Sequence, residues 1–455
     1  MREKTKILWL LISCVVVISM VVTFSLVGCK AAPEAVEVEK EEEAVAPAEE
    51  EEVVEEEVTI SEITTIKWLN LWDSPKEDLF AEFYKENPNI EVISEYLPFG
   101  DLLQQLQVRL MAGSDDFDVF SADVPLVAGY ALKGWLTPVD DIYTQEELDD
   151  FIESSLEAGK YNDQLVAAPV STSTQLLYIN LDLFEAAGVE PPGIDDRWTY
   201  EEIVEASQKT MSATPDTWGF TWGQTNRIYQ LGVLPGSLGA PMIGPDGLTV
   251  EGVINSEEWI KAFTFYRDVF NTYNIGPKGE AIGASDLFMA GKIAMYVDGP
   301  WNISQFDDTD LQFEWSVSRH PYFEEGVPAT PTGSWHIGVN VNSKNTEAAK
   351  KFVHWLTTGK GAELWWRYYG DMPAQKSVLA LFATDSEFDN PPWSYWRTAA
   401  DEANVNPIPR ALTPGYMEYE QLLMNAADDI INGADVEETL DTAAVRIGAE
   451  MEKYK

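Results

Sequence analysis

Aromatic and polar side chains adjoin at places where predicted strands end. Trp72 ends a β-rich segment at 64–72 and Asp73 follows it, while Asp123 follows a short apolar segment at 117–120. The loop at 218–229 adds aromatic, amide and guanidinium groups: Trp222, Gln224, Asn226, Arg227 and Tyr229. Aromatic rings can cover the C–H faces of a sugar, while carboxylates and amides bond to its hydroxyl groups in fixed directions. These places therefore predict a binding site for a carbohydrate-like ligand.

Each candidate also has a structural interpretation. Asp73 can simply precede a helix cap, Asp123 can cap a helix that begins at Val124, and Arg227 can form a surface ion pair. Tryptophan is largely buried on average, so most of the 16 Trp residues are expected in the core. Strand and helix patterns assign four of them to packing: Trp68, Trp355, Trp365 and Trp366.

The sequence contains few residues and motifs that are typical of catalytic sites. The histidines are His320, His336 and His354, and the sequence has no Gly-x-Ser-x-Gly elbow, HExxH pair or phosphate-binding loop. The 77 Asp and Glu residues leave a two-carboxylate glycoside hydrolase open, although Asp73 and Asp123 are the one pair that stands out at strand ends. We predict no catalytic residue, no metal site and no cofactor.

The N-terminal segment has the pattern of an export signal. Basic residues precede an apolar stretch at 7–27, and Leu-Val-Gly-Cys at 26–29 resembles the bacterial lipobox. We predict a lipoprotein signal peptide at 1–28, a lipidated Cys29 and an extracytoplasmic protein anchored to the membrane, on the periplasmic side if an outer membrane is present. An uncleaved transmembrane anchor is the alternative, because the stretch is long enough to span a bilayer.

Acidic residues dominate the composition, and the formal net charge is −47. Glu runs at 33–58 cannot bury enough apolar surface to fold, so residues 29–59 are predicted to form a disordered tether. No Lys/Arg cluster is present to neutralise phosphates, which argues against nucleic acid. Cys14 lies in the predicted signal peptide, so Cys29 has no disulfide partner in the mature chain.

Strand and helix patterns alternate after the tether. Strands are predicted at 64–72, 90–97 and 117–120, with helices from Ser74 and at 101–111. This βαβαβ order predicts an α/β fold with an open, mostly parallel sheet that binds ligands at the carboxyl ends of its strands. Further segments follow: strands at 165–169, 175–180 and 293–297, and helices at 199–211, 257–270, 346–357 and 416–455.

Several stretches follow one another over residues 60–455, including NPNIEV, DLLQQLQVRLMAGSDDFDVFSAD, FMAGKIAMYVDGPW, VNSKNTEAAKKFVHWLT and YYGDMPAQ. In this order they resemble the family 1 extracellular solute-binding proteins of ABC importers, the maltose-binding-protein-like group. The resemblance implies a two-lobed type II periplasmic-binding-protein fold, with lobes joined by crossing hinge strands. Projected onto this sequence, lobe 1 takes 60–170 with 299–338, and lobe 2 takes 171–298 with 339–455.

The same resemblance adds candidate ligand-binding residues. Thr172 lies in the first projected crossing, and Trp335 lies in the third. Trp301 follows the Gly-Pro pair of a turn whose Trp often stacks on sugar in the family. Tyr416 and Tyr419 open the C-terminal helical region, where the family often places another aromatic residue.

The resemblance implies a binding protein rather than an enzyme. A monomer would capture a sugar or short oligosaccharide by hinge closure and deliver it to the transmembrane subunits of an ABC permease. The same fold with a polyamine or another small solute stays an alternative, because Trp walls and carboxylates also bind cations.

Overall fold

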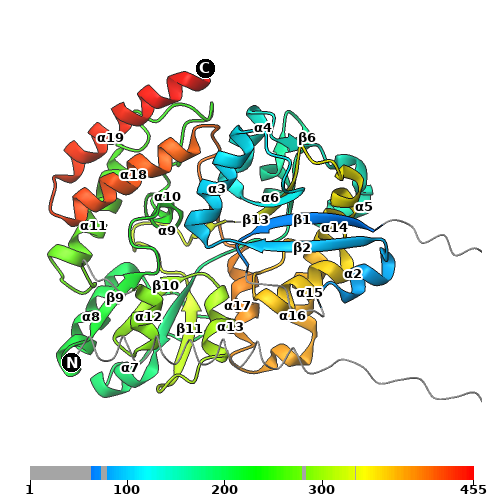
Figure 1. Ribbon diagram of the computed structural model, residues 1–455. Helices are drawn as coiled ribbons and strands as arrows, with labels where there is room; N and C mark the ends of the chain where they lie inside the picture. The colour runs from blue at the N-terminus through cyan, green and yellow to red at the C-terminus, as the bar shows by residue number, and fades with distance from the viewer. Residues whose placement is uncertain (1–62, 73–78, 279–282, 334) are drawn as a thin grey trace, which may run out of the picture. The chain divides into compact units, whose positions relative to one another are not determined.

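The computed structural model describes residues 63–72, 79–278, 283–333 and 335–455 (Figure 1). The predicted signal peptide, the lipidation site Cys29 and the acidic tether lie outside the described residues, and so does Asp73. Within the described residues, no helix is long and apolar enough to cross a membrane.

The first sheet has the strand order β2–β1–β3–β13–β4, and β7 also pairs with β13. β1 is parallel to both β2 and β3, while β13 is antiparallel to β3, β4 and β7. The bounds of its strands are β1 Thr64–Asn70, β2 Ile90–Tyr96, β3 Val119–Asp123, β4 Leu136–Thr137, β7 Ala167–Pro169 and β13 Trp335–Asn340. The predicted β-strands of the βαβαβ unit are therefore confirmed, and they form the parallel part of this sheet.

The second sheet has the strand order β11–β8–β10–β9. β9 and β10 are parallel, and β8 is antiparallel to β10 and β11. Its strands are β8 Leu176–Asn180, β9 Trp218–Trp222, β10 Ile293–Asp298 and β11 Trp315–Arg319. Two small pairs complete the strands: β5 Lys160–Tyr161 with β6 Gln164–Leu165, and β12 Thr330–Thr332 with β14 Pro407–Pro409.

Helices surround both sheets (Figure 1). Those before β10 are α2 Ala81–Glu86, α3 Phe99–Met111, α4 Val127–Leu132, α5 Gln145–Asp150, α6 Glu153–Ala158, α7 Leu181–Ala187, α8 Tyr200–Ala213, α9 Ile228–Leu231, α10 Val233–Ser237, α11 Glu257–Asn271 and α12 Ala284–Met289. Those after it are α13 Trp301–Asp307, α14 Thr346–Thr357, α15 Gly359–Tyr369, α16 Lys376–Thr384, α17 Tyr395–Glu402, α18 Tyr416–Ile431 and α19 Val436–Met451. Short 3-10 helices are η1 Val124–Leu126, η2 Asp140–Ile142, η3 Ser386–Asp389 and η4 Glu452–Tyr454.

Local sequence explains several helix boundaries. Thr199 and Glu202 form a reciprocal capping box at the start of α8, where a helix was predicted at 199–211. The C-terminal segment, predicted as one helical region, is two helices that lie side by side (Figure 1). Gly433 has φ +100°, which suits glycine and ends α18, and the Asp435 side chain then accepts from Glu438 N–H to cap α19.

Strand pairing differs from the expected lobe boundaries. Residues 299–338 were assigned to lobe 1, but β11 within that range pairs with β8 in the second sheet. After β11 the chain returns through β12 to β13 in the first sheet, and α14 packs on β13 and β1. The expected bounds were projected from the family resemblance, which does not specify these long-range pairings.

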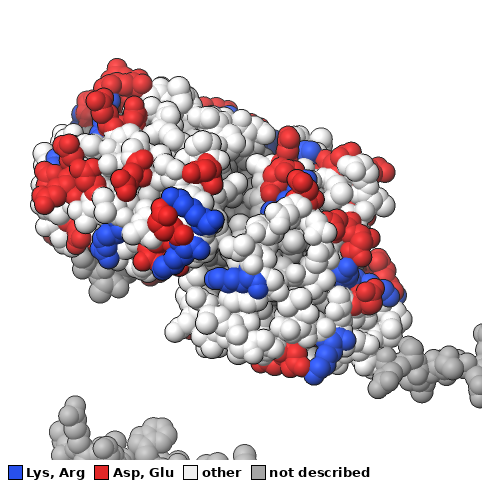
Figure 2. All heavy atoms as spheres, turned by 90° about the horizontal axis from the view of Figure 1, so that it is seen from above, with Lys and Arg blue, Asp and Glu red and all other residues white. Residues whose placement is uncertain are grey.

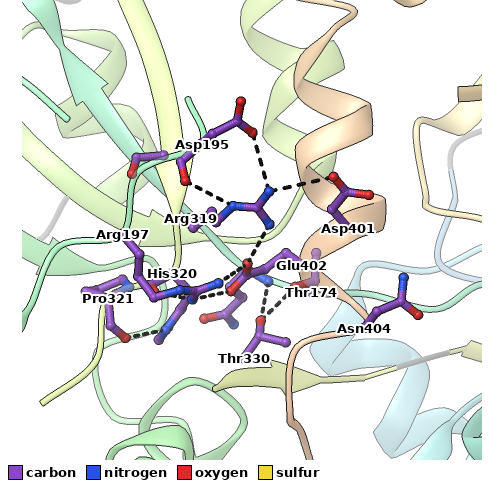
Figure 3. Close-up of polar contacts among 12 residues, drawn as sticks. Thr174, Asp195, Arg197, Arg319, His320, Pro321, Thr330, Asp401, Glu402 and Asn404 are labelled. Carbon is purple, nitrogen blue, oxygen red and sulfur yellow. Dashed lines mark hydrogen bonds and ion pairs between the residues drawn. The ribbon is translucent and has the colours of Figure 1, made fainter. Parts of the chain in front are cut away.

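A buried ion-pair network lies beside the connection between β11 and β12 (Figure 3). Both oxygens of the fully buried Glu402 accept hydrogen bonds from Arg197, each at 2.6 Å, and Arg319 lies 3.7 Å from the same carboxylate. Arg197 also donates to the backbone carbonyl oxygen of His320 at 2.7 Å. The network therefore joins α17, the end of β11 and the segment before α8.

Candidate ligand-binding site

A cavity of about 290 Å³ lies where strands of both sheets end. The cavity brings together the following predicted ligand-binding residues: Trp72, Asp123, Thr172, Gln224, Tyr229, Trp301 and Trp335. Arg227, which has a surface ion pair as its structural interpretation, also lines it. Residues that the sequence reasoning missed complete the lining: Leu71, Phe99, Ser171, Ser173, Gly333, Asp371 and Arg410.

Secondary structure positions the predicted residues. Trp72 follows β1, and Asp123 is the last residue of β3. Trp335 begins β13 and stands opposite Asp123 in the antiparallel register, which brings two residues distant in sequence to one edge. Trp301 is the first residue of α13, directly after the turn that ends β10. The predicted gathering of side chains at strand ends is thus present.

Aromatic rings form one wall of the cavity. The Trp72 ring meets the Trp335 ring edge-on, with centroids 5.7 Å apart, and the Trp365 ring at 4.3 Å. Trp335 in turn meets Phe99 at 5.9 Å, with the two rings perpendicular. These contacts fix the rings before any ligand arrives, so little side-chain entropy remains to be lost on binding.

Asp123 is held by arginine. Arg410 donates from both terminal nitrogens to the two oxygens of Asp123, and the Nη1–Oδ2 distance is 2.8 Å. The Arg227 Nη2 atom lies 4.0 Å from Asp123 Oδ2 and 2.7 Å from Glu420 Oε1. Arg410 also lies over the Tyr229 ring, 5.0 Å from its centroid. The charge of Asp123 is therefore neutralised by the protein itself.

Asp371 has a different environment. Its Oδ2 atom accepts a hydrogen bond from Trp72 Nε1 at 2.7 Å. Burial raises the pKa of Asp371 to about 6, and the hydrogen bond from Trp72 offsets only part of that effect. Among the residues that the structure describes, no basic side chain lies within ion-pair distance of Asp371.

The first crossing segment supplies hydroxyl groups. Ser173 Oγ lies 2.7 Å from Tyr229 Oη and accepts from Gly333 N–H at 3.0 Å. Thr172 N–H donates to the Met372 carbonyl oxygen at 2.8 Å. Gln224 contributes a side-chain oxygen, and within the described part of the chain this atom has no hydrogen-bond partner. Acceptors and donors thus stand around the aromatic wall.

Two predicted aromatic positions lie in the core instead. Trp222 is fully buried, and its ring packs against Phe220 at 4.8 Å and against Tyr266 of α11 at 5.7 Å. Tyr419 is fully buried and donates to the Met242 carbonyl oxygen at 2.5 Å. Both were expected at the cavity, but the packing of α11 and α18 takes them into the core.

Tyr416 and Asn226 also lie away from the cavity lining. Tyr416 is buried and donates to Glu420 Oε1 at 3.2 Å, so it supports the partner of Arg227. Asn226 donates to both carboxylate oxygens of Asp428, at 3.0 and 3.1 Å. Their polar groups serve contacts with α18 rather than the cavity.

Sequence signals for the missed residues were weak. Asp371 stands in the stretch YYGDMPAQ, which supported the family resemblance, but no aromatic–polar pattern at a strand end singles it out. Arg410 follows the short β14, and only its long-range pairing with Asp123 reveals its place. Tertiary contacts define both residues.

Larger hollows lie elsewhere, including three of about 540, 480 and 390 Å³. The first lies on the surface around Lys350, His354 and Trp355, the second lies between α4 and α18, and the third lies between α18 and α19. None of these three gathers aromatic rings and hydrogen-bonding groups from both sheets, so the smaller cavity is the better ligand site. The described residues contain no group of His, Cys, Asp and Glu side chains suited to hold a metal ion. On the face in Figure 2, acidic side chains are widely spread with basic ones between them.

The two sheets and the cavity at their strand ends define a solute-binding protein of the two-lobed periplasmic class. Residues 72–363 match the family described as bacterial extracellular solute-binding protein, and the chain belongs to this family.

Several relatives and solved structures are similar to this chain. The maltotriose-binding protein of Pyrococcus abyssi is 25% identical over 285 residues, which are 62% of this chain and 59% of that protein. The mannitol-binding protein of Pseudomonas aeruginosa is 23% identical over 70% of this chain and 72% of its own length. An ABC substrate-binding protein of Listeria monocytogenes in complex with cycloalternan has a TM-score of 0.77 at 24% identity, covering 86% of this chain and 100% of that chain.

Proposed function

We propose that this chain captures a sugar or short oligosaccharide in the cavity and delivers it to the permease of an ABC importer. The observation that carries the proposal is the convergence of Trp72, Trp301 and Trp335 with hydrogen-bonding side chains from both sheets. Flat rings can cover sugar C–H faces, and the amides, hydroxyls and carboxylates can bind the hydroxyl groups. The volume is near the low end for ligand pockets, which favours a small sugar.

Names of relatives support a carbohydrate. Maltotriose-binding and mannitol-binding proteins are among the relatives, and similar structures hold maltotriose or cycloalternan. Polyhydroxylated ligands are common to these proteins, although their sizes differ. The ligand class that we propose is therefore a polyhydroxylated carbohydrate.

Hinge closure is the proposed mechanism. Ligand would bridge groups on the two sheets and stabilise a closed form by contacts that an open form cannot make. We propose one lobe around each sheet, with the hinge formed by segment 171–175 and the strands β12 and β14. Hydrogen bonds join these segments, including Thr174 Oγ1 to Thr330 Oγ1 at 2.6 Å.

The membrane anchor stays part of the proposal. Export, lipidation of Cys29 and a tether at 29–59 rest on the sequence pattern, and monomeric action rests on the family resemblance. Mass spectrometry of the membrane fraction would test lipidation. A diacylglyceryl group on Cys29 would support the proposal, and a protein that retains residues 1–28 would contradict it.

The environment of Asp123 favours binding over hydrolysis. A two-carboxylate glycoside hydrolase needs one protonated and one ionised carboxyl group. Bidentate pairing with Arg410 occupies both oxygens of Asp123, so this side chain is poorly placed as a proton donor or nucleophile.

Titration calorimetry against a solute panel tests the proposal. The panel would contain mono- and disaccharides, short α- and β-glucans, polyamines and amino acids. We expect saturable one-to-one binding of one sugar class, lost in Trp301→Ala and kept in a variant of the remote core, Trp222→Phe. Binding of polyamines alone would overturn the sugar assignment, and product formation from an oligosaccharide would overturn the binding-protein assignment.

A further inference from the structure

Two carboxylates line the cavity, and their lone pairs are used differently. Both oxygens of Asp123 accept from Arg410. Asp371 accepts one hydrogen bond within the described part of the chain, from Trp72 Nε1 to Oδ2. An ionised carboxylate has about four acceptor positions, so the described residues leave most of the acceptor capacity of Asp371 unused.

Trp72 holds the carboxylate of Asp371 in a fixed orientation. Its Nε1–Oδ2 bond of 2.7 Å fixes one oxygen of Asp371, and its ring is itself fixed by Trp335 and Trp365. A sugar ring placed beside this wall would present hydroxyl groups at its edge while its C–H face meets the aromatic surface. Hydroxyls on adjacent carbons can donate to the two oxygens of one carboxylate.

Both a hydroxyl group and an ammonium group could donate to Asp371, since no basic partner lies within ion-pair distance in the described chain. Arg227 and Arg410 line the same cavity but are paired with Glu420 and Asp123, so their charges do not decide between the two kinds of donor. The proposed function favours hydroxyl groups, because the aromatic wall beside Asp371 suits the C–H face of a sugar ring.

We propose that Asp371, held in place by Trp72, determines ligand specificity by accepting hydrogen bonds from two adjacent hydroxyl groups of the bound sugar. This inference rests on the proposed function, because it names the residue that recognises the sugar in the same cavity. Sites built to bond a hydroxyl group reject analogues that lack it, because a desolvated polar group is left unpaired. Deoxy or O-methyl analogues at the recognised pair should therefore bind weakly.

The test is calorimetric titration of the purified full chain, in detergent, with the best sugar of the panel and its single deoxy analogues. Asp371→Asn keeps the shape of the side chain and an acceptor for Trp72 but removes the charge. We expect its affinity for the parent sugar to fall about tenfold to a hundredfold, as for loss of a hydrogen bond to a charged group. Asp310→Asn, at an exposed position, is the matched control and should bind as the wild type does.

A comparison of analogues separates recognition from structural support. One deoxy analogue should bind the wild type much more weakly than the parent sugar, and this difference should shrink in Asp371→Asn. The thermal midpoint of unliganded Asp371→Asn at pH 8 should not fall, because the change removes a partly buried charge that has no basic partner among the described residues. A merely structural role would lower the midpoint and leave the discrimination between analogues intact.

The contrary results are distinct. Sugar binding that is unchanged in Asp371→Asn, or an equal loss for the deoxy analogue in both proteins, would overturn this inference and leave the proposed function standing. Preference for an amino sugar over its neutral parent would overturn the assignment of hydroxyl groups. Failure of the wild type to bind any sugar would overturn the proposed function and this inference together.

Discussion

Asp123 and Asp371 line one cavity, but their surroundings give them opposite roles. Asp123 is paired on both oxygens with Arg410, so its charge is already satisfied within the protein. Asp371 is desolvated and has Trp72 as its hydrogen-bond donor, so its charge is costly until a ligand donates to it. A position in the cavity lining is therefore not enough to identify a ligand contact. The hydrogen bonds that each carboxylate already accepts within the protein also have to be considered.

The largest expected effect comes from breaking the ion pair between Asp123 and Arg410. Asp123→Asn would leave Arg410 buried without its counter-charge, and loss of one partner of a buried pair costs about 3–5 kcal/mol. Urea unfolding should show this loss in the free energy of unfolding. Lys209→Ala, which removes the exposed pair with Glu205, is the control and should have a far smaller effect. Equal effects in the two variants would contradict the account of Asp123.

A second prediction contrasts two tryptophans that the sequence suggested equally. Trp335→Ala removes part of the aromatic wall, and its affinity for sugar should fall roughly tenfold to a hundredfold. Trp222→Phe should lower the free energy of unfolding by about 1–2 kcal/mol through lost core packing and leave affinity unchanged. Titration calorimetry and urea unfolding of both variants check this contrast between affinity and stability. A loss of sugar affinity in Trp222→Phe would contradict its assignment to the core.

A third prediction concerns pH. The pKa of Asp371 is raised to about 6 in the unliganded protein, and sugar hydroxyls would donate to its ionised form. Affinity should therefore rise with pH through about 6 and level off above it, by up to about tenfold between pH 5 and pH 7. Calorimetry at several pH values should show this rise in the wild type and a flatter profile in Asp371→Asn. A steep rise in both proteins would assign the titration to another group.

The same raised pKa affects stability with the opposite sign. The folded protein binds the proton of Asp371 more tightly than the unfolded chain does, so this group destabilises the fold as pH rises from about 4 to above 6. Burial also raises the pKa of Asp298 to about 6, so the wild type has at least two such groups. The midpoint temperature of thermal unfolding should fall less steeply with pH in Asp371→Asn than in the wild type. An unchanged slope would show that Asp371 does not contribute.

The smallest expected effect is at Asn226. Its bonds to Asp428 lie at an exposed contact with α18 and away from the cavity. Asn226→Ala should cost under about 1 kcal/mol of unfolding free energy and should not change affinity. Parallel unfolding and titration check this, and a clear loss of affinity would return Asn226 to the ligand site.

Local patterns predicted much of the fold and part of the site. The apolar run at β1, the cap at Thr199 and the strand end at Asp123 are each visible in a short stretch of sequence. Trp222 was misplaced because its position near a strand end resembles that of Trp72, while its burial depends on α11. Arg410 and Asp371 were missed because contacts with Asp123 and Trp72, far away in the chain, give them their roles.

The most direct test is calorimetric titration of the best sugar from the panel into the wild type, Trp335→Ala and Asp371→Asn. The account predicts one-to-one binding by the wild type and weaker binding by both variants, because the two changes remove the aromatic and the hydrogen-bonding parts of one site. Equal binding by all three proteins would place the sugar elsewhere, and no binding of any sugar by the wild type would contradict the proposed function.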